Sequence, residues 1–278
     1  MARKTAHCLA IGGLDPSGGA GVLADAEAIA AVGARPLVAV TTVTAQNVLA
    51  FHSAWPVPIR VLEAQLESLL CAFPVGAVKT GALPTAGHVR LVAAALRSSD
   101  APIVVDPVLG ASRGPGLVDR AVARAILEHL APRAGLITPN APEAAVLARR
   151  PVRNAAEAEA AATVLLDAGA RAVLIKGGHL DGCGDLLATR NGRTWLPIRR
   201  VAGIATHGTG CALAAAVAAG LALGRSLPTA VRGARALVAA GLRSAVRRRA
   251  EWGPDLVGLR LDRRRQAGWT VRGPGGVY

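Results

Sequence analysis

The strongest constraint on the fold is the alternation of short apolar runs with longer segments of helical periodicity. Uninterrupted apolar runs are typical of buried parallel strands, which are joined by right-handed helical crossovers. The predicted strands are His7–Gly12, Leu37–Val43, Val75–Lys79, Ile103–Asp106, Gly135–Thr138 and Ala172–Lys176. The predicted helices are Ala20–Val32, Pro58–Ala72, Thr85–Arg97, Leu117–Leu130, Pro142–Ala148, Ala155–Ala168, Thr209–Leu223 and Pro228–Arg248. The pattern predicts an α/β fold with a doubly wound, mostly parallel central sheet and helices on both faces.

The rhythm changes after residue 176. Two further strands, Asp185–Thr189 and Thr194–Ile198, flank an Asn-Gly pair at 191–192, which is typical of a hairpin turn. No linker or internal repeat interrupts the chain, and 278 residues suffice for one large core. We therefore predict one domain over residues 1–250 and a basic, loosely attached tail over 251–278.

The formal charge of +14 is concentrated near the C-terminus, where twelve arginines and three acidic residues follow position 224. No aromatic residues alternate with these arginines as they do in many single-strand binding surfaces, so nucleic acid is an unlikely partner. The apolar stretch 201–224 has the length of a membrane span but consists mainly of Ala, Gly and Thr, which argues against insertion. The four cysteines have no CxxC spacing, as expected of a cytoplasmic protein.

Polar residues recur where the predicted strands end. They are Asp15, Gln46, Lys79, Asp106, Asn140 and Lys176. A single one of them could be a capping or turn residue. Because the carboxyl ends of parallel strands share one edge of a sheet, six in succession predict a ligand site there.

Two glycine-rich segments precede predicted helices. The first, GGLDPSGGAG at 12–21, lets the backbone approach a ligand closely. Residues 19–24 also match the dinucleotide fingerprint GxGxxA, but the second strand does not end in the acidic residue that such a site needs, and the absence of GK[ST] excludes a Walker loop. The second, THGTGC at 206–211, should direct backbone N–H groups at an anion such as a transferred phosphoryl group. Cys211 falls in the first helical turn, where we expect its pKa to be lowered; a small buried residue is the simpler explanation of this cysteine taken alone.

The remaining candidates combine a cation with oxygen ligands. Lys176 is one of only three lysines and ends a buried strand at a glycine turn, which suggests contact with an anion. Asp106 and Glu143 could hold Mg²⁺ directly or through water. Locally, Asn140 and Glu143 also fit a helix cap.

Together and in this order, these motifs resemble the ribokinase-like superfamily and, within it, the hydroxymethylpyrimidine/phosphomethylpyrimidine kinases of thiamine biosynthesis. The matching segments are GGLDPSGGAG at 12–21 with Ala24-Asp25, TAQN at 44–47, VKTG at 78–81, VVDPV at 104–108, TPNAPEA at 138–144, IKGGH at 175–179 and THGTGC at 206–211. The resemblance implies phosphorylation, dependent on ATP and Mg²⁺, of 4-amino-5-hydroxymethyl-2-methylpyrimidine and then of its monophosphate. It also implies a homodimer.

The resemblance assigns roles residue by residue. Lys176 would meet the ATP phosphates together with Asn140 and Thr209, while Asp106 and Glu143 would serve the metal. Gly208, Gly210 and Cys211 would form the anion hole, with Cys211 in the position of the catalytic base. The acceptor pocket would be formed by Gln46, Gly13, Asp15, Ala20 and Val108.

One departure bears on the acceptor. The family usually shows KIGM after the third strand, whereas this chain has Lys79-Thr80-Gly81-Ala82, so an alanine replaces a methionine that would pack on the pyrimidine. A pyridoxal kinase-like enzyme acting on another hydroxymethyl heterocycle is therefore an alternative. From another class, a non-catalytic module that binds a ligand or nucleic acid could use the same fold.

Overall fold

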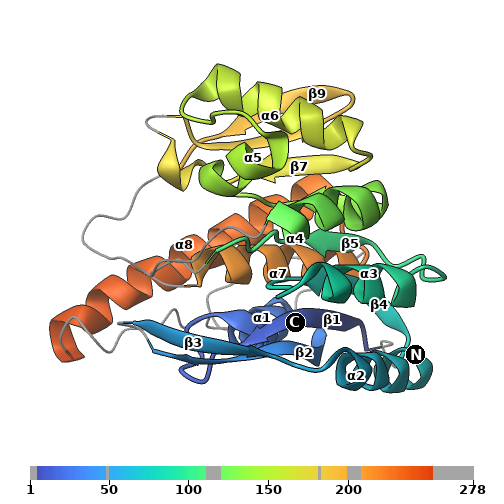
Figure 1. Cartoon of the computed structure of the whole chain (residues 1–278). Coiled ribbons are helices and arrows are strands. Elements are labelled where there is room, and N and C mark those ends of the chain that lie inside the picture. Colours follow the sequence, from blue (N-terminus) through green and yellow to red (C-terminus); the bar gives the residue numbers. More distant parts are fainter. Residues whose placement is uncertain (1–4, 48–49, 111–119, 181–182, 199–207, 253–278) are drawn as a thin grey trace, which may run out of the picture.

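The structure is a computed structural model that describes residues 5–47, 50–110, 120–180, 183–198 and 208–252 (Figure 1). The basic tail predicted from residue 251 lies outside this part of the chain, apart from residues 251 and 252, which extend the last helix. Thr206 and His207 of the second glycine-rich segment also lie outside it.

One nine-stranded sheet with the order β3-β2-β1-β4-β5-β6-β7-β8-β9 runs through the described residues. Its strands are β1 (His7–Leu14), β2 (Arg35–Gln46), β3 (Phe51–Pro56), β4 (Val75–Thr80), β5 (Ile103–Val105), β6 (Ala134–Ile137), β7 (Ala172–Ile175), β8 (Asp185–Thr189) and β9 (Gly192–Leu196). The six strands from β2 to β7 in this order pair in parallel, whereas β3, β8 and β9 are antiparallel to their neighbours. The chain leaves β1 on one side and returns to β4 on its other side, which is the topological switch point where ligands bind in such sheets.

Helices cover both faces of the sheet, as the sequence predicted (Figure 1). One face carries α1 (Gly21–Val32), α7 (Thr209–Ala222) and α8 (Leu227–Trp252). The other carries α2 (Ile59–Ala72), α3 (Ala86–Ala95), α4 (Arg120–Ala125) with its π-helical continuation η1 (Ile126–Leu130) and the turn η2 (Ala131–Arg133), α5 (Ala141–Ala148) and α6 (Ala155–Asp167). A further short turn, η3 (Gly177–His179), follows β7.

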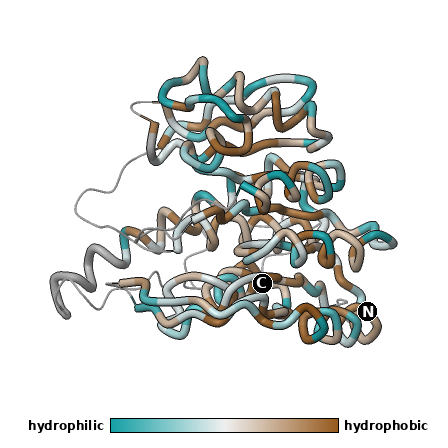
Figure 2. The backbone as a smooth tube through the Cα atoms, in the orientation of Figure 1, coloured by the Kyte–Doolittle hydropathy of each residue, from teal (hydrophilic) through white to brown (hydrophobic). Residues whose placement is uncertain are grey.

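Alternate residues of the central strands enter two separate cores. In β1, Leu9 and Ile11 point to the α2–α6 face, while Cys8 and Ala10 point to the α1–α7–α8 face. Figure 2 shows hydrophobic stretches along the central strands and helices of mixed hydropathy around them. Because both faces are covered, these strands are apolar throughout, and this is why the sequence marks them so clearly.

Helix α7 is buried along almost its whole length, with residues 212–220 inaccessible or nearly so. It packs against α1, α8 and the strands β1, β4 and β5. Alanine side chains permit this close approach on every side of the helix, which explains the long uncharged stretch in the sequence. No helix in the described part of the chain is long and apolar enough to cross a membrane.

Strand β3 is the element that sequence reasoning missed. It contains His52, Ser53 and Pro56 and shows little apolar alternation, so its strand conformation depends on pairing with β2. That pairing joins Thr42 to Pro56 and Gln46 to Phe51, and it extends β2 three residues beyond its predicted end. Gln46 therefore lies in an antiparallel ribbon at the edge of the sheet rather than in a loop after the strand.

Candidate active site

The first glycine-rich loop, between β1 and α1, is shaped by Asp15. This side chain is 1% exposed. Its Oδ1 accepts hydrogen bonds from the Ser17 amide at 2.9 Å and the Ser17 hydroxyl at 2.7 Å, and its Oδ2 accepts one from the Ala20 amide at 2.9 Å. Both carboxylate oxygens thus bind the loop itself, so Asp15 contributes to a pocket by fixing the backbone at Gly18–Ala20.

The second glycine-rich segment contacts the first through its backbone. Gly208 precedes α7 with φ 82°, and a Cβ atom there would lie 1.9 Å from the carbonyl oxygen of Gly19. Only glycine fits this position, where the N-terminus of α7 meets the loop before α1. The Cys211 sulfur accepts a hydrogen bond from the amide of Gly21, the first residue of α1. The predicted anion-hole residues Gly208, Gly210 and Cys211, and the predicted nucleotide-binding residue Thr209, are therefore adjacent to the first glycine loop.

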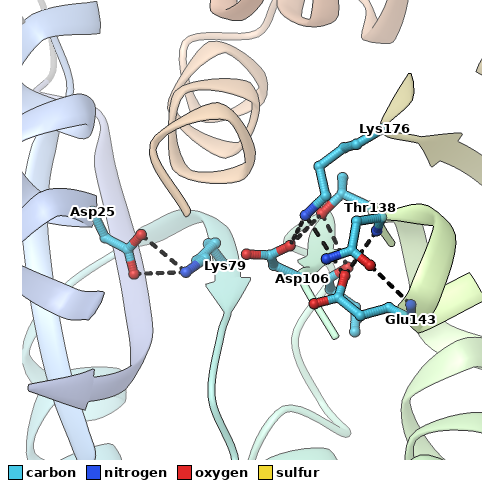
Figure 3. A network of polar contacts seen from close by, with 8 residues as sticks. Asp25, Lys79, Asp106, Thr138, Glu143 and Lys176 are labelled. Carbon is cyan, nitrogen blue, oxygen red and sulfur yellow. Dashed lines mark hydrogen bonds and ion pairs between the residues drawn. The ribbon is translucent and has the colours of Figure 1, made fainter. Parts of the chain in front are cut away.

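Lys176 joins this group from the end of β7 (Figure 3). Its Nζ lies 2.8 Å from Asp106 Oδ1 and 3.8 Å from Glu143 Oε2. A Cβ atom on Gly210 would lie 3.0 Å from the same Nζ, so the ammonium group lies against the first turn of α7. Here the positive end of the helix dipole and a lysine charge face the same space, as binding of a phosphoryl group requires.

The turn after Lys176 is fixed by residues that sequence reasoning did not single out. The Gly177 amide donates to Asp185 Oδ1 at 2.8 Å, and Arg235 of α8 donates to Asp185 Oδ2 at 2.7 Å. A Cβ atom on Gly177 would lie only 1.7 Å from the Gly184 carbonyl oxygen. The spacing of these residues does not predict the contact, because Arg235 is 50 positions away from Asp185.

Asn140 and Glu143 form the predicted capping box at the start of α5. The Glu143 amide donates to Asn140 Oδ1, and the Asn140 amide donates to Glu143 Oε2, both at 2.8 Å. Burial raises the pKa of Glu143 to about 7, although the nearby Lys176 charge opposes this shift. Burial also acts to raise the pKa of Asp106, but Lys176, Lys79 and the Thr138 hydroxyl outweigh it and hold that pKa below its usual value.

The arrangement fits a divalent metal. Asp106 Oδ1 and Glu143 Oε2 are engaged by protein donors, whereas neither Asp106 Oδ2 nor Glu143 Oε1 has a hydrogen-bonding partner among the described residues. Within those residues there is no cluster of three or more metal-ligating side chains. One free oxygen on each of two carboxylates suits Mg²⁺, which commonly takes its other ligands from water and substrate phosphates.

The expectation for the acidity of Cys211 was wrong in direction. Burial raises the pKa of its thiol to about 11, and this effect exceeds the lowering by the Lys79 charge and by the hydrogen bond from Gly21. The helix N-terminus is present as predicted, but the sequence did not reveal how strongly the surrounding protein desolvates this half-buried thiol. At neutral pH Cys211 is a thiol.

Lys79 also differs from its expected place as a ligand-facing residue. Its side chain is 1% exposed and donates to both carboxylate oxygens of Asp25, at 2.9 and 2.7 Å. Asp25 is fully buried in α1. In the sequence, the only hint of this ion pair is an acidic residue on the otherwise apolar face of that helix. In Figure 3 Lys79 lies between Asp25 and Asp106.

Of the predicted acceptor residues, Gly13 lies beside β2 and the segment after β4. A Cβ atom on Gly13 would lie 2.9 Å from Thr42 Cγ2 and 3.7 Å from Ala82 Cβ, so these three residues form one wall. Ala20 is buried and precedes α1, and Val108 is half-buried beyond β5. Gln46 is half-buried three residues beyond the last pairing of β1 with β2.

The fold and the convergence of a lysine, two carboxylates and a helix N-terminus on a glycine loop define a ribokinase-like phosphotransferase. Residues 15–255 match the family described as phosphomethylpyrimidine kinase. The chain is 42% identical over 231 residues to the hydroxymethylpyrimidine/phosphomethylpyrimidine kinase of Streptomyces coelicolor, covering 83% of this chain and 86% of that protein. This protein belongs to the phosphomethylpyrimidine kinase family.

Solved structures agree with this assignment. The chain is similar to pyridoxal kinase from Staphylococcus aureus in complex with AMP-PCP and pyridoxal, with TM-score 0.82, 32% identity and 94% of each chain covered. It is also similar to phosphomethylpyrimidine kinase from Clostridium difficile 630, with TM-score 0.74, 29% identity and coverage of 84% of this chain and 98% of that one.

The contact between the two glycine-rich segments can be tested at Gly208. We expect Gly208→Ala to reduce kcat at least about tenfold, because the new methyl group must displace either Gly19 or the start of α7. Gly224→Ala is the matched control, since Gly224 has φ 76° but no atom within 4 Å of an added Cβ. The control carries only the backbone strain, about 1–2 kcal/mol. Equal kinetic losses in the two variants would contradict the contact.

The raised pKa of Glu143 predicts how stability depends on pH without Mg²⁺. Its pKa is about 7 in the folded chain, against an ordinary value of 4.5. Folding therefore favours the protonated form, so this contribution is complete below pH 4.5 and is lost as the pH rises through 7. Urea unfolding from about pH 5 to 8 should show wild type losing on the order of 2 kcal/mol more than Glu143→Gln. Parallel losses would contradict the shift.

Proposed function

We propose that this kinase transfers the γ-phosphoryl group of ATP to 4-amino-5-hydroxymethyl-2-methylpyrimidine and then to the monophosphate so formed, giving the diphosphate. The observation that carries the proposal is the position of Lys176. Its ammonium group lies beside the first turn of α7, and that turn contacts the glycine loop at the β1–β4 switch point. An anionic phosphate and a bound acceptor would meet at this point.

In the first transfer, the acceptor hydroxyl oxygen forms a bond to the γ-phosphorus while the bond from that phosphorus to the β,γ-bridging oxygen breaks. The electron pair leaves with ADP. Lys176 and the amides of the first turn of α7, from Gly208 to Cys211, stabilise the charge on the transferred group. Asn140 and Thr209 border the nucleotide side. Mg²⁺, held through Asp106 and Glu143, would supply further neutralisation of phosphate charge.

The hydroxyl proton requires an acceptor, and we propose the Cys211 thiolate. Its high pKa makes the thiolate scarce at neutral pH but a strong base once it has formed. In the second transfer the nucleophile is a phosphate oxygen that is already anionic and needs no base. The two steps therefore make different demands on the same site.

The acceptor side would be formed by Gly13, Ala20 and Val108, with Gln46 hydrogen-bonding the aminopyrimidine. Asp15 supports this side by fixing the loop that carries Ala20. A second candidate acceptor is pyridoxal. Ala82, which lies near Gly13 and Thr42, has a small side chain and would leave room for a larger ring. The similarity to a pyridoxal kinase structure supports the same alternative.

The assignment is tested by incubating the protein with ATP, Mg²⁺ and each acceptor and measuring products by mass. We expect one and then two phosphoryl groups on the pyrimidine, with a higher kcat/KM than for pyridoxal in direct competition. Lys176→Met should reduce turnover by at least about 10²-fold, since it removes a charge that contacts the transferred group. Preference for pyridoxal would favour the second candidate, and failure to phosphorylate either acceptor would favour a non-catalytic module.

The role of Cys211 is tested by measuring each transfer separately. Cys211→Ala should slow the first phosphorylation by about 10²-fold or more, the usual contribution of a general base, and the second by less than about tenfold. Cys71→Ala is the control, because Cys71 is an exposed thiol on α2 and should affect neither step. Equal losses in both steps would show that Cys211 acts through its place in the helix rather than as a base.

We also propose that the protein is a cytoplasmic homodimer. Strand β3 forms one edge of the sheet, where Trp55 is 58% exposed and pairs with Val43, which is 41% exposed. Such an apolar pair on a strand with a free edge is suited to contact with a second copy. The location is supported by the free thiols of all four cysteines.

A further inference from the structure

The ion pair between Asp25 and Lys79 has no part in the mechanism proposed above, although it lies next to the site. It joins α1 to β4, and its side chains are 0% and 1% exposed. The Lys79 ammonium group donates to both Asp25 oxygens, and the two residues are 54 positions apart in the sequence. The pair is therefore a specific tertiary contact inside the core.

Stability does not explain why a charged pair occupies this place. Removing two charges from water costs several kcal/mol each, and apolar side chains of similar volume often make a protein as stable or more stable. The surroundings of Asp25 in α1 are alanine, valine and isoleucine, which would accept such a replacement. We therefore ask which neighbouring groups the charges of Asp25 and Lys79 could act on.

Those neighbours belong to the phosphoryl site. Helix α7 packs directly on β4, the strand that carries Lys79, and on α1, which carries Asp25. The Lys79 ammonium group lies against Gly81, since a Cβ atom there would be 2.7 Å from Nζ. Cys211 accepts a hydrogen bond from the Gly21 amide, one helical turn before Asp25. The thiol, the lysine and the carboxylate thus occupy one junction between three elements.

Three buried charged side chains influence the acidity of Cys211. Lys79 lowers the pKa of the thiol more than any other group, whereas Asp106 and Asp25 raise it. Lys176 lies against the residue before Cys211, because a Cβ atom on Gly210 would be 3.0 Å from its Nζ. Because Lys79 is enclosed by protein, its field is screened little by water and acts strongly on near neighbours. Asp25 in turn holds the lysine in its charged form and fixes the position of the ammonium group.

We propose that Lys79 is a positioning residue for phosphoryl transfer: clamped by Asp25, it is a fixed positive charge that acts on Cys211 from the sheet side of α7. The proposal rests on the proposed role of Cys211 as the base of the first transfer. Two apolar side chains of the same volume could fill this space but could not act on Cys211 through a charge.

The experiment compares Lys79→Met with the double variant Asp25→Leu/Lys79→Met. The single variant leaves an uncompensated buried carboxylate and loses stability, so its kinetics alone would be ambiguous. The double variant restores an apolar interior and, on physical grounds, should recover most of the stability in urea unfolding. If the pair is purely structural, the double variant should recover activity together with stability. If Lys79 acts through its charge, the double variant should recover stability but not activity.

The decisive measurement needs neither substrate nor turnover. Iodoacetamide reacts with thiolates, so the rate of Cys211 alkylation at about pH 8.5, resolved by peptide mass spectrometry, reports its thiolate fraction. The exposed Cys71 in the same molecule is an internal reference. We expect Cys211 alkylation to fall at least tenfold in both variants while Cys71 is unchanged. The first phosphorylation should fall in kcat by a similar factor in the double variant, with KM for ATP nearly unchanged.

Two results would overturn the proposal. One is a double variant that is stable and alkylates Cys211 at the wild-type rate relative to Cys71. The other is a double variant with reduced alkylation but an unchanged kcat in the first transfer. If the protein failed to phosphorylate the pyrimidine at all, the alkylation rates would still decide whether Lys79 acts on Cys211, so the two proposals fail separately.

Discussion

Mutual neutralisation of buried charges is the constraint on which the site depends. Five ionisable side chains alternate in sign from α1 across the sheet to α5, in the order Asp25, Lys79, Asp106, Lys176 and Glu143 (Figure 3). Each would be costly to bury alone, because an unpaired ion in the interior loses several kcal/mol of hydration. The ends of β4, β5 and β7 must therefore stay in register for the row to exist. A parallel sheet does this by hydrogen-bonding neighbouring strands along their whole length.

Beside the Lys176 charge, the backbone supplies a second source of positive potential, the amides at the start of α7. Within the row each lysine is paired with at least one carboxylate. The amides at the start of α7 are not compensated in this way, and the αL conformation of Gly208 brings them against the first glycine loop. The alanines of α7 make this approach possible, since larger side chains would hold the helix away from α1 and the sheet. Catalytic geometry here depends on small residues as much as on reactive ones.

Local patterns predicted most of the fold and one half of the site. Apolar runs marked every parallel strand, and the residues after them, such as Asp106 and Lys176, could be placed at one edge because parallel strands end together. The capping box of Asn140 and Glu143 was likewise a local signal. Contacts between distant segments could not be predicted in this way. The partner of Lys79 is 54 positions away, and the turn after Lys176 is held by Arg235.

Two errors have the same cause. Strand β3 was missed because pairing with β2, rather than its own composition, makes it a strand. The acidity of Cys211 was misjudged because a helix N-terminus is visible in sequence while the enclosure of the sulfur is not. In both cases a tertiary contact decided the outcome. For Cys211, burial raised the pKa, whereas the helix N-terminus alone would have lowered it.

The proposed phosphoryl side of the site is held by more contacts than the proposed acceptor side. This difference bears on which acceptor the site can bind. The phosphoryl side consists of backbone amides, buried ion pairs and glycines that admit no side chain. The proposed acceptor side would depend on a few side chains, chiefly Ala82 and Gln46, and Gln46 is half-buried in the ribbon at the edge of the sheet. Substitution on the acceptor side can therefore change which heterocyclic alcohol fits without disturbing the charged row. Similarity to both pyrimidine and pyridoxal kinases fits such a division, in which the proposed transfer site lies beside a wall that can change.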